Sequence, residues 1–166
     1  MNMDRQYTRL DEVRQVIDPM LAEIGDEETK RCAFVHLYGV GLMAAVLALK
    51  RGFDRRTAEL AEITGLLHDL PVYTEGADRK GHAHVSARYA REKVLERLDC
   101  FTEEEKDRIC RGIDHHSDKQ VQGDPFDEII KDADVAQHIL RNPAEDYDRE
   151  KERERAQKVL MELTGS

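Results

Sequence analysis

The sequence predicts an all-α fold, a single helical bundle of about six to seven helices. Apolar residues recur at helical spacing along most of the chain, and capping signals mark the expected helix starts. No stretch alternates apolar and polar residues over a useful strand length, and no repeat or low-complexity linker divides the chain. At 166 residues, the length also favours one domain. We therefore expect a single domain over residues 1–166.

The apolar faces and the helix-breaking residues predict the range of each helix. Their approximate ranges are 8–24, 27–50, 54–67, 82–98, 102–116, 124–140 and a last, highly charged helix after 142. Pro19 is expected to kink or divide the first of them. The segments LPVYTEGADRKG and SDKQVQG are rich in turn formers and are predicted as loops.

Local signals justify most of these boundaries. They are the capping boxes Thr8–Asp11 and Thr102–Glu105, the N-cap Asp54, the closing Gly52, and the Asp124-Pro125 and Asn142-Pro143 helix starts. A capping side chain satisfies backbone N–H groups that have no partner inside the helix. The sequence therefore specifies where the helices start more sharply than how they pack.

Composition and charge exclude several classes of protein. Hydrophobic residues make up 40% and aromatic residues 5%, with no Trp, so we expect a core of Leu, Val, Ile and Ala. The 26 basic and 35 acidic residues give a net charge of −9. This balance argues against a non-specific nucleic-acid binder, which would carry a basic surface. A small phosphorylated molecule is still an acceptable partner, because a few cations or a metal can hold one.

The cysteines and the apolar runs indicate a cytoplasmic protein. Three cysteines form an odd number with no C-x-x-C pair, which suits a reducing compartment. The start MNMDRQYTRLDEV has no signal-peptide pattern. The longest nearly apolar run, residues 40–49, is short of the ~20 residues that span a bilayer. We expect it in a fully buried central helix and expect no membrane partner.

Seven histidines are many for this length, and several fall on predicted inner faces. The candidates are His36, the pair His68-Asp69, His82 or His84, His115 or His116, and Asp134. Buried ionisable groups are costly unless they are paired or bind a metal. Imidazole and carboxylate together suit Fe, Mn, Zn or similar ions. The ordered set therefore predicts a metal site assembled from several helices.

These residues carry a family resemblance. His36 lies in RCAFVHLYGV, His68 and Asp69 in GLLHDL, and Asp134 in IIKDADVA. This order resembles the HD-domain superfamily of metal-dependent phosphohydrolases over about residues 30–140. The resemblance implies an HD-type core there, with the N- and C-terminal helices flanking it. It favours Asp134 over Asp132, because family segments place the ligand in the Ala-Asp dipeptide.

A wider family pattern adds two histidines and a second metal. The segment HAHVSARYAREKVL resembles a family helix start that selects His82, with His84 as the alternate. The segment ICRGIDHHS similarly selects His116 and leaves His115 near the entrance. The six-residue set implies a dinuclear site bridged by Asp69. This pattern is similar to bacterial diadenosine-tetraphosphate hydrolases and to cyclic-dinucleotide phosphodiesterases of the superfamily.

The chain also departs from some branches of the family. Leu70-Pro71-Val72 follows the HD pair where Ile-Gly-Lys is often found, so a lysine that could meet phosphate is missing. No GYP signature follows His116, which argues against the cyclic-di-GMP branch. The nucleoside-monophosphatase branch has a catalytic glutamate that would fall near Val72, so that chemistry is not expected.

The resemblance implies a phosphohydrolase that acts on a nucleotide or another phosphate ester through metal-activated water. The expected cofactor is one or two divalent transition-metal ions (Fe, Mn or Zn, with Mg possible), and Asp69 is the expected catalytic residue. Arg79, Lys80 and Lys119 are candidates for contact with substrate phosphate. The alternatives are a non-catalytic metal-bound sensor or binding module and, less favoured, a di-iron oxygenase.

The last predicted helix leaves one further question open. Its narrow apolar edge consists of Ala156, Val159, Leu160 and Leu163. This edge could pack along its own chain, or it could form the contact of a homodimer. Dense charges of both signs on the remaining faces predict a solvated surface with supporting i, i+4 pairs.

Overall fold

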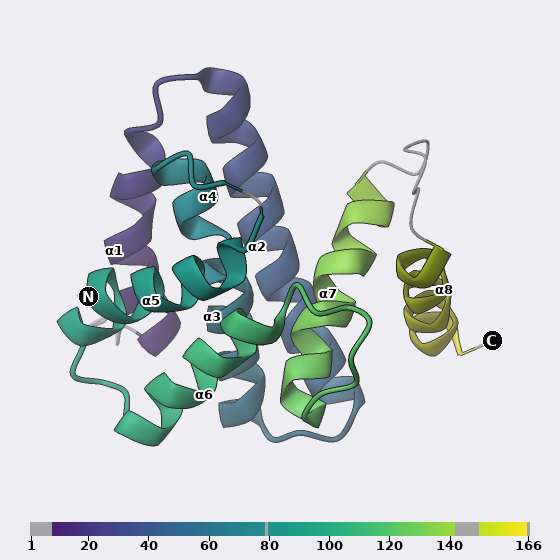
Figure 1. Cartoon of the computed structure of the whole chain (residues 1–166). Coiled ribbons are helices and arrows are strands. Elements are labelled where there is room, and N and C mark those ends of the chain that lie inside the picture. The colour runs from purple at the N-terminus through teal and green to yellow at the C-terminus, as the bar shows by residue number, and fades with distance from the viewer. Residues whose placement is uncertain (1–7, 79, 142–149, 166) are drawn as a thin grey trace, which may run out of the picture.

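A computed structural model describes residues 8–78, 80–141 and 150–165, and in these ranges every regular element is a helix (Figure 1). The helices are α1 Arg9–Ala22, α2 Glu27–Lys50, α3 Arg55–Leu67, α4 Leu70–Thr74, α5 His82–Lys93, the 3-10 turn η1 Leu95–Arg97, α6 Glu103–His115, α7 Pro125–Arg141 and α8 Glu150–Thr164. Seven of the described helices have twelve residues or more. The prediction of an all-α bundle is confirmed.

The capping signals act as the sequence predicts. Thr8 and Asp11 cap α1 reciprocally, and Thr102 and Glu105 do the same for α6. The Asp54 side chain accepts a hydrogen bond from the backbone N–H at the third position of α3. Asn142-Pro143, the expected start of the last helix, lies outside the described residues.

Two segments differ from the expected boundaries. The loop expected at residues 70–81 begins with the short helix α4, which has Pro71 in its first turn, where a missing N–H costs no hydrogen bond. The helix expected over residues 82–98 ends at Lys93, because Val94 leaves helical geometry (φ −121°, ψ −65°) before η1. Pro19, by contrast, stays inside α1 and does not divide it.

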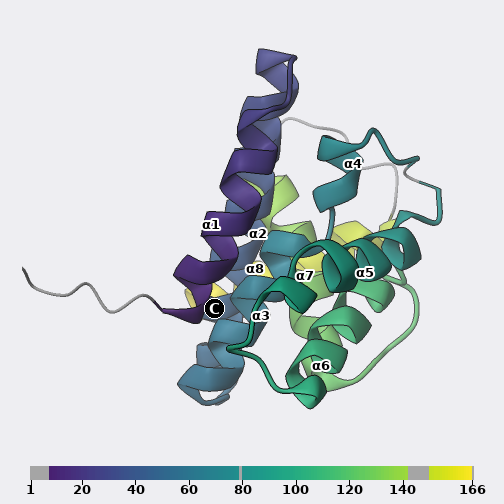
Figure 2. The ribbon, with the colours of Figure 1, turned by 90° about the vertical axis from the view of Figure 1, so that its left-hand side faces the viewer.

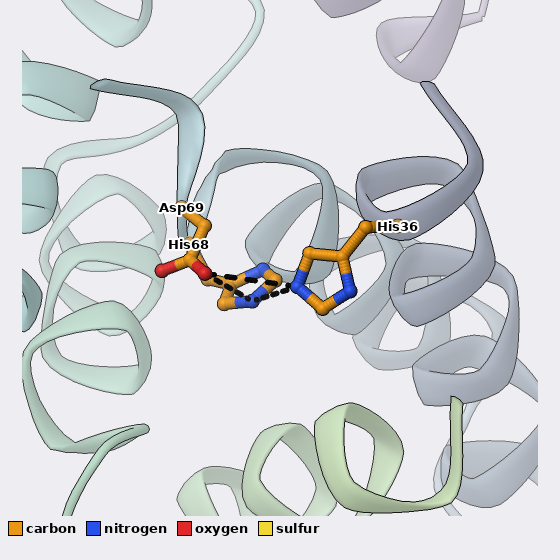
Figure 3. Close-up of side chains that lie close together, drawn as sticks. All are labelled: His36, His68 and Asp69. Atoms are coloured by element: carbon orange, nitrogen blue, oxygen red, sulfur yellow. Dashed lines mark hydrogen bonds and ion pairs between the residues drawn. The ribbon is translucent and has the colours of Figure 1, made fainter. Parts of the chain in front are cut away.

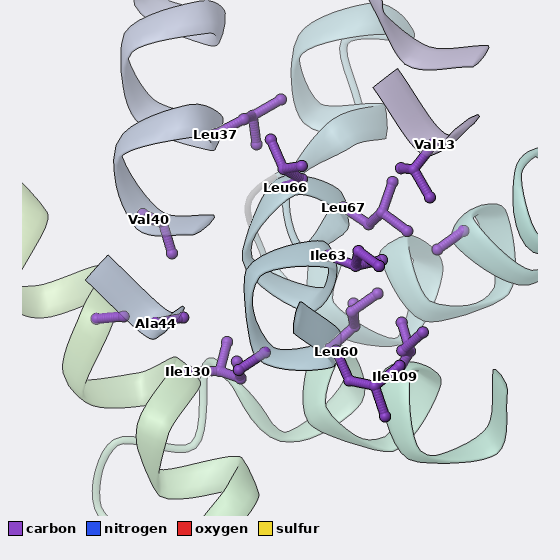
Figure 4. Packing of buried hydrophobic residues seen from close by; sticks show 14 of the residues in the cluster. Val13, Leu37, Val40, Ala44, Leu60, Ile63, Leu66, Leu67, Ile109 and Ile130 are labelled. Carbon is purple, nitrogen blue, oxygen red and sulfur yellow. The ribbon is translucent and has the colours of Figure 1, made fainter. Parts of the chain in front are cut away.

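The bundle is organised around α2. Figure 2 shows α1 and α2 on one side of the molecule and α5 and α6 on the other. The core fills the space between them, with Val40 and Ala44 of α2 facing the same apolar cluster as Ile63 and Leu66 of α3 (Figure 4). Helix α7 closes this core from a third side and contributes Ile130.

The central helix is buried on only one side. Among the described residues, α2 is the one helix whose length and composition would allow it to cross a membrane, and 44% of its most apolar window is buried in the bundle. The expectation of full burial for residues 40–49 is wrong. The inner face is buried, while large apolar side chains remain exposed on the outer face at Val35, Leu42, Val46 and Leu49.

The apolar edge of α8 packs against its own chain. Ala156 and Val159 are fully buried, and Leu163 lies against the main core cluster. The edge therefore packs within the chain, and a homodimer contact through the rest of α8 stays a prediction.

Two glycines bring α2 and α3 into backbone contact. A Cβ atom added at Gly65 would lie 2.7 Å from the Cα of Gly41 and 2.8 Å from its nitrogen. A Cβ atom added at Gly41 would lie 2.9 Å from the carbonyl oxygen of Glu62. Because these neighbours are backbone atoms, they cannot move aside as a flexible side chain could. The helix spacing at this crossing therefore depends on the absence of side chains.

Replacing Gly65 by Ala should therefore destabilise the protein, although Ala is the better helix former. We expect Gly65→Ala to lower the free energy of unfolding by about 1–3 kcal/mol, the usual cost of overpacking. Denaturant titration of the metal-free protein measures it. Gly25→Ala is the matched control, since nothing lies within 4 Å of a Cβ atom there. A Gly65→Ala variant as stable as the control would contradict the close-contact argument.

Glu105 joins three helices through its carboxylate. Its Oε1 atom accepts hydrogen bonds from Arg9 of α1 (2.9 Å) and Arg56 of α3 (2.7 Å). Its other oxygen completes the capping box at the start of α6. Burial alone would raise the pKa of Glu105, but these bonds lower it from 4.5 to about 2. The ionised form is therefore the one that stabilises the fold.

A lowered carboxyl pKa gives stability that is present above the unfolded value and lost as the pH falls. We expect the contribution of Glu105 to be full above pH 4.5 and to disappear towards pH 2. Urea titrations between pH 6 and pH 2.5 should show a weaker pH dependence for Glu105→Gln than for the wild type. The exposed neighbour Glu104 provides the control Glu104→Gln. Equal pH profiles for the wild type and Glu105→Gln would refute the assignment.

Candidate metal centre

Two buried histidines face each other across the α2–α3 crossing. The Nε2 atoms of His36, in α2, and His68, which follows α3, are 3.1 Å apart (Figure 3). His36 Nδ1 lies 2.9 Å from Gln137 Oε1, and His68 Nδ1 lies 2.7 Å from the Gly65 carbonyl. Both partners are acceptors, so each Nδ1 carries a proton, and in the neutral tautomer each ring directs an Nε2 lone pair inward. Two such lone pairs repel each other unless a cation lies between them.

Two carboxylates complete this first cluster. Asp69 Oδ2 lies 3.6 Å from both Nε2 atoms, and Asp134 Oδ1 lies 3.6 Å from that of His36 and 3.7 Å from that of His68. The Oδ1 atoms of Asp69 and Asp134 are buried and accept no hydrogen bond from the residues that the structure describes. A buried carboxylate oxygen without a partner is costly, and a cation would satisfy it.

A second cluster lies on the other side of Asp69. The Nε2 atoms of His82, at the start of α5, and His116, at the end of α6, are 2.9 Å apart. They lie 3.0 Å and 3.4 Å from Asp69 Oδ1. His116 Nδ1 donates to the Ile113 carbonyl at 2.6 Å, which again leaves Nε2 as the free acceptor. Asp69 thus presents one oxygen to each histidine pair.

The structure separates the alternates that the sequence left open. The His84 side chain is 81% exposed and contacts Asp114, and the His115 side chain is 43% exposed and contacts Asp127. Both rings therefore lie outside the two clusters, whereas His82 and His116 lie inside. Asp132 is turned towards Arg51 and Arg155, and Asp134 faces the histidines.

The electrostatics of the clusters favour positive charge between the ligands. Burial alone would raise the pKa of Asp69, but the neighbouring imidazole of His68, together with those of His116, His36 and His82, lowers it far below its usual value. Burial would lower the pKa of His68, yet Asp69 and Asp134 raise it. Burial lowers the pKa of His116 more than Asp69 raises it, which favours the neutral imidazole.

The donor set fits a divalent transition metal. Imidazole nitrogens and carboxylate oxygens converge within 4.8 Å of one another in the groups His36–His68–Asp69, His68–His116–Asp134 and Asp69–His82–His116. The Nδ1–H bonds to Gln137, Gly65 and Ile113 fix the tautomer, as partners behind metal-binding histidines usually do. Two anionic carboxylates would offset the charge of a bound cation.

Sequence reasoning missed two residues of this centre. Gln137 orients His36, and His138 stacks on the His36 ring with the centroids 4.9 Å apart. His138 Nδ1 also lies 3.9 Å from Asp134 Oδ1, and these two residues form a further ligand group with His36. The available signal was helical spacing, because Gln137 and His138 follow Asp134 by three and four residues on α7.

The three residues expected at the substrate phosphate have different positions. Lys119 lies beside the centre, with Nζ 2.5 Å from Asp134 Oδ2 and 2.8 Å from the His116 carbonyl. Lys80 is exposed in the loop before α5, where its backbone N–H donates to Asp78. Arg79 lies outside the described residues.

An all-helical bundle around a buried His/Asp cluster is consistent with a helical protein that holds a divalent metal. The family model HD domain matches residues 33–139, which is more than half of the chain. The chain belongs to the HD domain family, and its cluster is consistent with an HD-type metal site. Comparisons with curated proteins and with solved structures found no match.

The two clusters predict a stoichiometry that mutation can separate. If each histidine pair holds an ion with Asp69, His82→Ala and His116→Ala should each reduce bound metal from two equivalents to one. His84→Ala and His115→Ala are the adjacent controls and should retain both ions. Mass spectrometry of metal on protein purified without chelator and away from air measures this. One equivalent in the wild type, unaffected by His82→Ala, would contradict a second site.

Proposed function

We propose that the protein is a metal-dependent phosphohydrolase that acts on a nucleotide or another phosphate ester. The observation that carries this proposal is the position of Asp69 between two histidine pairs, with Oδ2 towards His36 and His68 and Oδ1 towards His82 and His116. Membership of the HD domain family supports the same class of activity. A carboxylate shared in this way suits a pair of divalent ions.

The residues of the first cluster would hold one ion, and those of the second would hold another. We propose Fe, Mn or Zn, with Mg as a further candidate, because neutral imidazole and carboxylate suit these ions. When bound, such ions would supply Lewis acidity and lower the pKa of a coordinated water molecule, in the case of zinc to about 7. The chain itself fixes the ligands: Gln137, Gly65 and Ile113 hold three imidazoles in the tautomer that leaves Nε2 unprotonated.

Asp69 is the proposed catalytic residue. Its lowered pKa keeps the carboxylate ionised, so its two oxygens would help the two histidine pairs to hold cations or would orient a water molecule. Its place directly after α3 allows it to reach a site shared with His68, although neighbours within a helix point about 100° apart. The departure from helical geometry at Asp69 (φ −120°, ψ 14°) makes this possible.

Few basic side chains near the centre are available to bind the phosphate of the proposed substrate. Lys119 binds Asp134 and therefore neutralises a ligand in this state, while Lys80 is exposed. His138 is partly exposed, with 32% of its side chain accessible, and it borders His36. We propose that phosphate charge is met mainly by the bound cations, with Lys80 as a peripheral contact. This arrangement suits a small phosphate ester better than a long polyanion.

Asp69→Asn tests the proposal directly. Metal-reconstituted protein is assayed on p-nitrophenyl phosphate, bis-p-nitrophenyl phosphate, nucleoside mono-, di- and triphosphates, dinucleoside polyphosphates and cyclic dinucleotides. We expect turnover on at least one of these, lost by about 100-fold or more in Asp69→Asn, the scale of removing an electrostatic catalytic group. Asp114→Asn, whose carboxylate faces His84, is the control and should keep full activity.

The other outcomes separate the competing functions. Tight metal binding with no turnover on the panel would favour a sensor or binding module. Substrate-dependent uptake of O2 by the iron-loaded protein would favour an oxygenase. Full hydrolysis by an Asp69→Asn protein that has lost its metal would show that the activity does not belong to this centre.

A further inference from the structure

The C-terminal helix contacts the segments that adjoin the candidate metal centre, although it lies outside the family match. The match ends at residue 139, and α8 spans Glu150–Thr164. In Figure 1, α8 stands beside α7, the helix that carries Asp134. Arg155 of α8 contacts α7 and the segment between α6 and α7, which contains Lys119.

Lys119 connects the two histidine clusters through hydrogen bonds to one residue of each. Its Nζ atom donates to Asp134 Oδ2, on the first cluster, and to the carbonyl of His116, on the second. The Lys119 side chain is only 9% exposed, so this ammonium group is held in place and poorly solvated. Because Lys119 occupies Oδ2, the carboxylate of Asp134 turns Oδ1 towards His36 and His68.

Arg155 of α8 fixes the backbone of Lys119. Its Nη2 atom donates to the Lys119 carbonyl at 3.1 Å. Its Nη1 atom donates to Glu128 Oε2 at 2.7 Å and to Asp132 Oδ1 at 2.6 Å, both on α7. A single planar guanidinium therefore joins the Lys119 segment to the helix of Asp134. Lysine could not span the same three acceptors, since its ammonium is a point charge on a flexible stem.

Arg51 strengthens the same junction. Its Nη2 atom lies 2.6 Å from Asp132 Oδ2 and 2.8 Å from Glu162 Oε2. Asp132 is thus shared by an arginine of α2 and an arginine of α8. These partners account for Asp132 facing away from the histidines, and they hold α8 against the helix that carries the candidate ligand.

We infer that Arg155 is a positioning residue for the metal centre: through Lys119 it sets which oxygen of Asp134 faces His36 and His68. This inference rests on the proposed function, because it assumes that these residues bind a metal. It adds α8, a helix outside the HD match, to the parts of the chain that determine metal affinity. It also assigns Lys119 to the support of Asp134.

The test is a double-mutant cycle on metal affinity. Metal-free wild type, Lys119→Gln, Arg155→Gln and the double variant are titrated with Co²⁺, whose visible absorption reports both binding and ligand geometry. We expect Lys119→Gln to weaken binding by about 10- to 100-fold, as for other partners behind metal ligands. Arg155→Gln should weaken Co²⁺ binding by about 3- to 10-fold, since Arg155 contacts Lys119 and not the ligand Asp134 itself. The double variant should bind no more weakly than Lys119→Gln alone, because Arg155 acts through Lys119.

Two controls separate positioning from general stability. Lys158→Gln removes one positive charge from an exposed position on the same helix and should leave Co²⁺ affinity and spectrum unchanged. Arg155→Lys keeps the charge and should restore only part of the affinity. Thermal unfolding of each protein in chelator shows whether the metal-free fold is intact. If Arg155→Gln does not fold, the affinity and spectrum of Arg155→Lys decide the question.

The outcomes are distinct for this inference and for the proposed function. Wild-type affinity and an unchanged Co²⁺ spectrum in Arg155→Gln would overturn the inference while leaving a metal site intact. Effects of Lys119→Gln and Arg155→Gln that multiply in the double variant would overturn it as well, because the two residues would then act independently. A wild type that binds no Co²⁺, Mn²⁺ or Fe²⁺ would instead refute the proposed function.

Discussion

The close contact between α2 and α3 is the constraint on which the centre depends. Gly41 and Gly65 have no side chains to separate the two backbones. His36 precedes this contact by five residues and His68 follows it by three, so the crossing brings two imidazoles from separate helices within 3.1 Å. Gly65 has a second role, because its carbonyl receives the Nδ1–H of His68. Helix spacing and ring orientation are therefore set at one position.

The buried charges require a partner that the apolar core cannot supply. The carboxylates of Asp69 and Asp134 are largely removed from water, and each has one oxygen without a hydrogen bond from the described residues. The surrounding imidazoles are held as acceptors by Gln137, Gly65 and Ile113. Facing lone pairs and unpaired carboxylate oxygens destabilise one another in a medium of low dielectric. A bound divalent cation would relieve both the lone-pair repulsion and the unpaired carboxylate oxygens, and this buried cluster is consistent with an HD-type metal site.

The sequence was sufficient for the features that depend on local signals. Helix starts at Thr8, Asp54 and Thr102 follow from capping chemistry, and the order of His36, His68-Asp69 and Asp134 indicated the cluster. Features that depend on distant residues could not be predicted in this way. Gln137 is hydrogen-bonded to His36, although the two residues are 101 positions apart in the sequence. The same limit applies to Lys119, whose partner is decided by how α6, α7 and α8 pack. Burial of the α8 edge likewise depends on tertiary contacts.

The shared carboxylate of Asp69 has a consequence for how the two clusters fill. Because one residue serves both, an ion in either cluster changes the charge and orientation that the other cluster presents. Thermodynamic linkage makes this coupling reciprocal: the factor by which the first ion alters affinity for the second is the factor by which the second alters affinity for the first. If both clusters bind a cation, they would therefore form one coupled unit, and the ratio of singly to doubly loaded protein would depend on the free metal concentration.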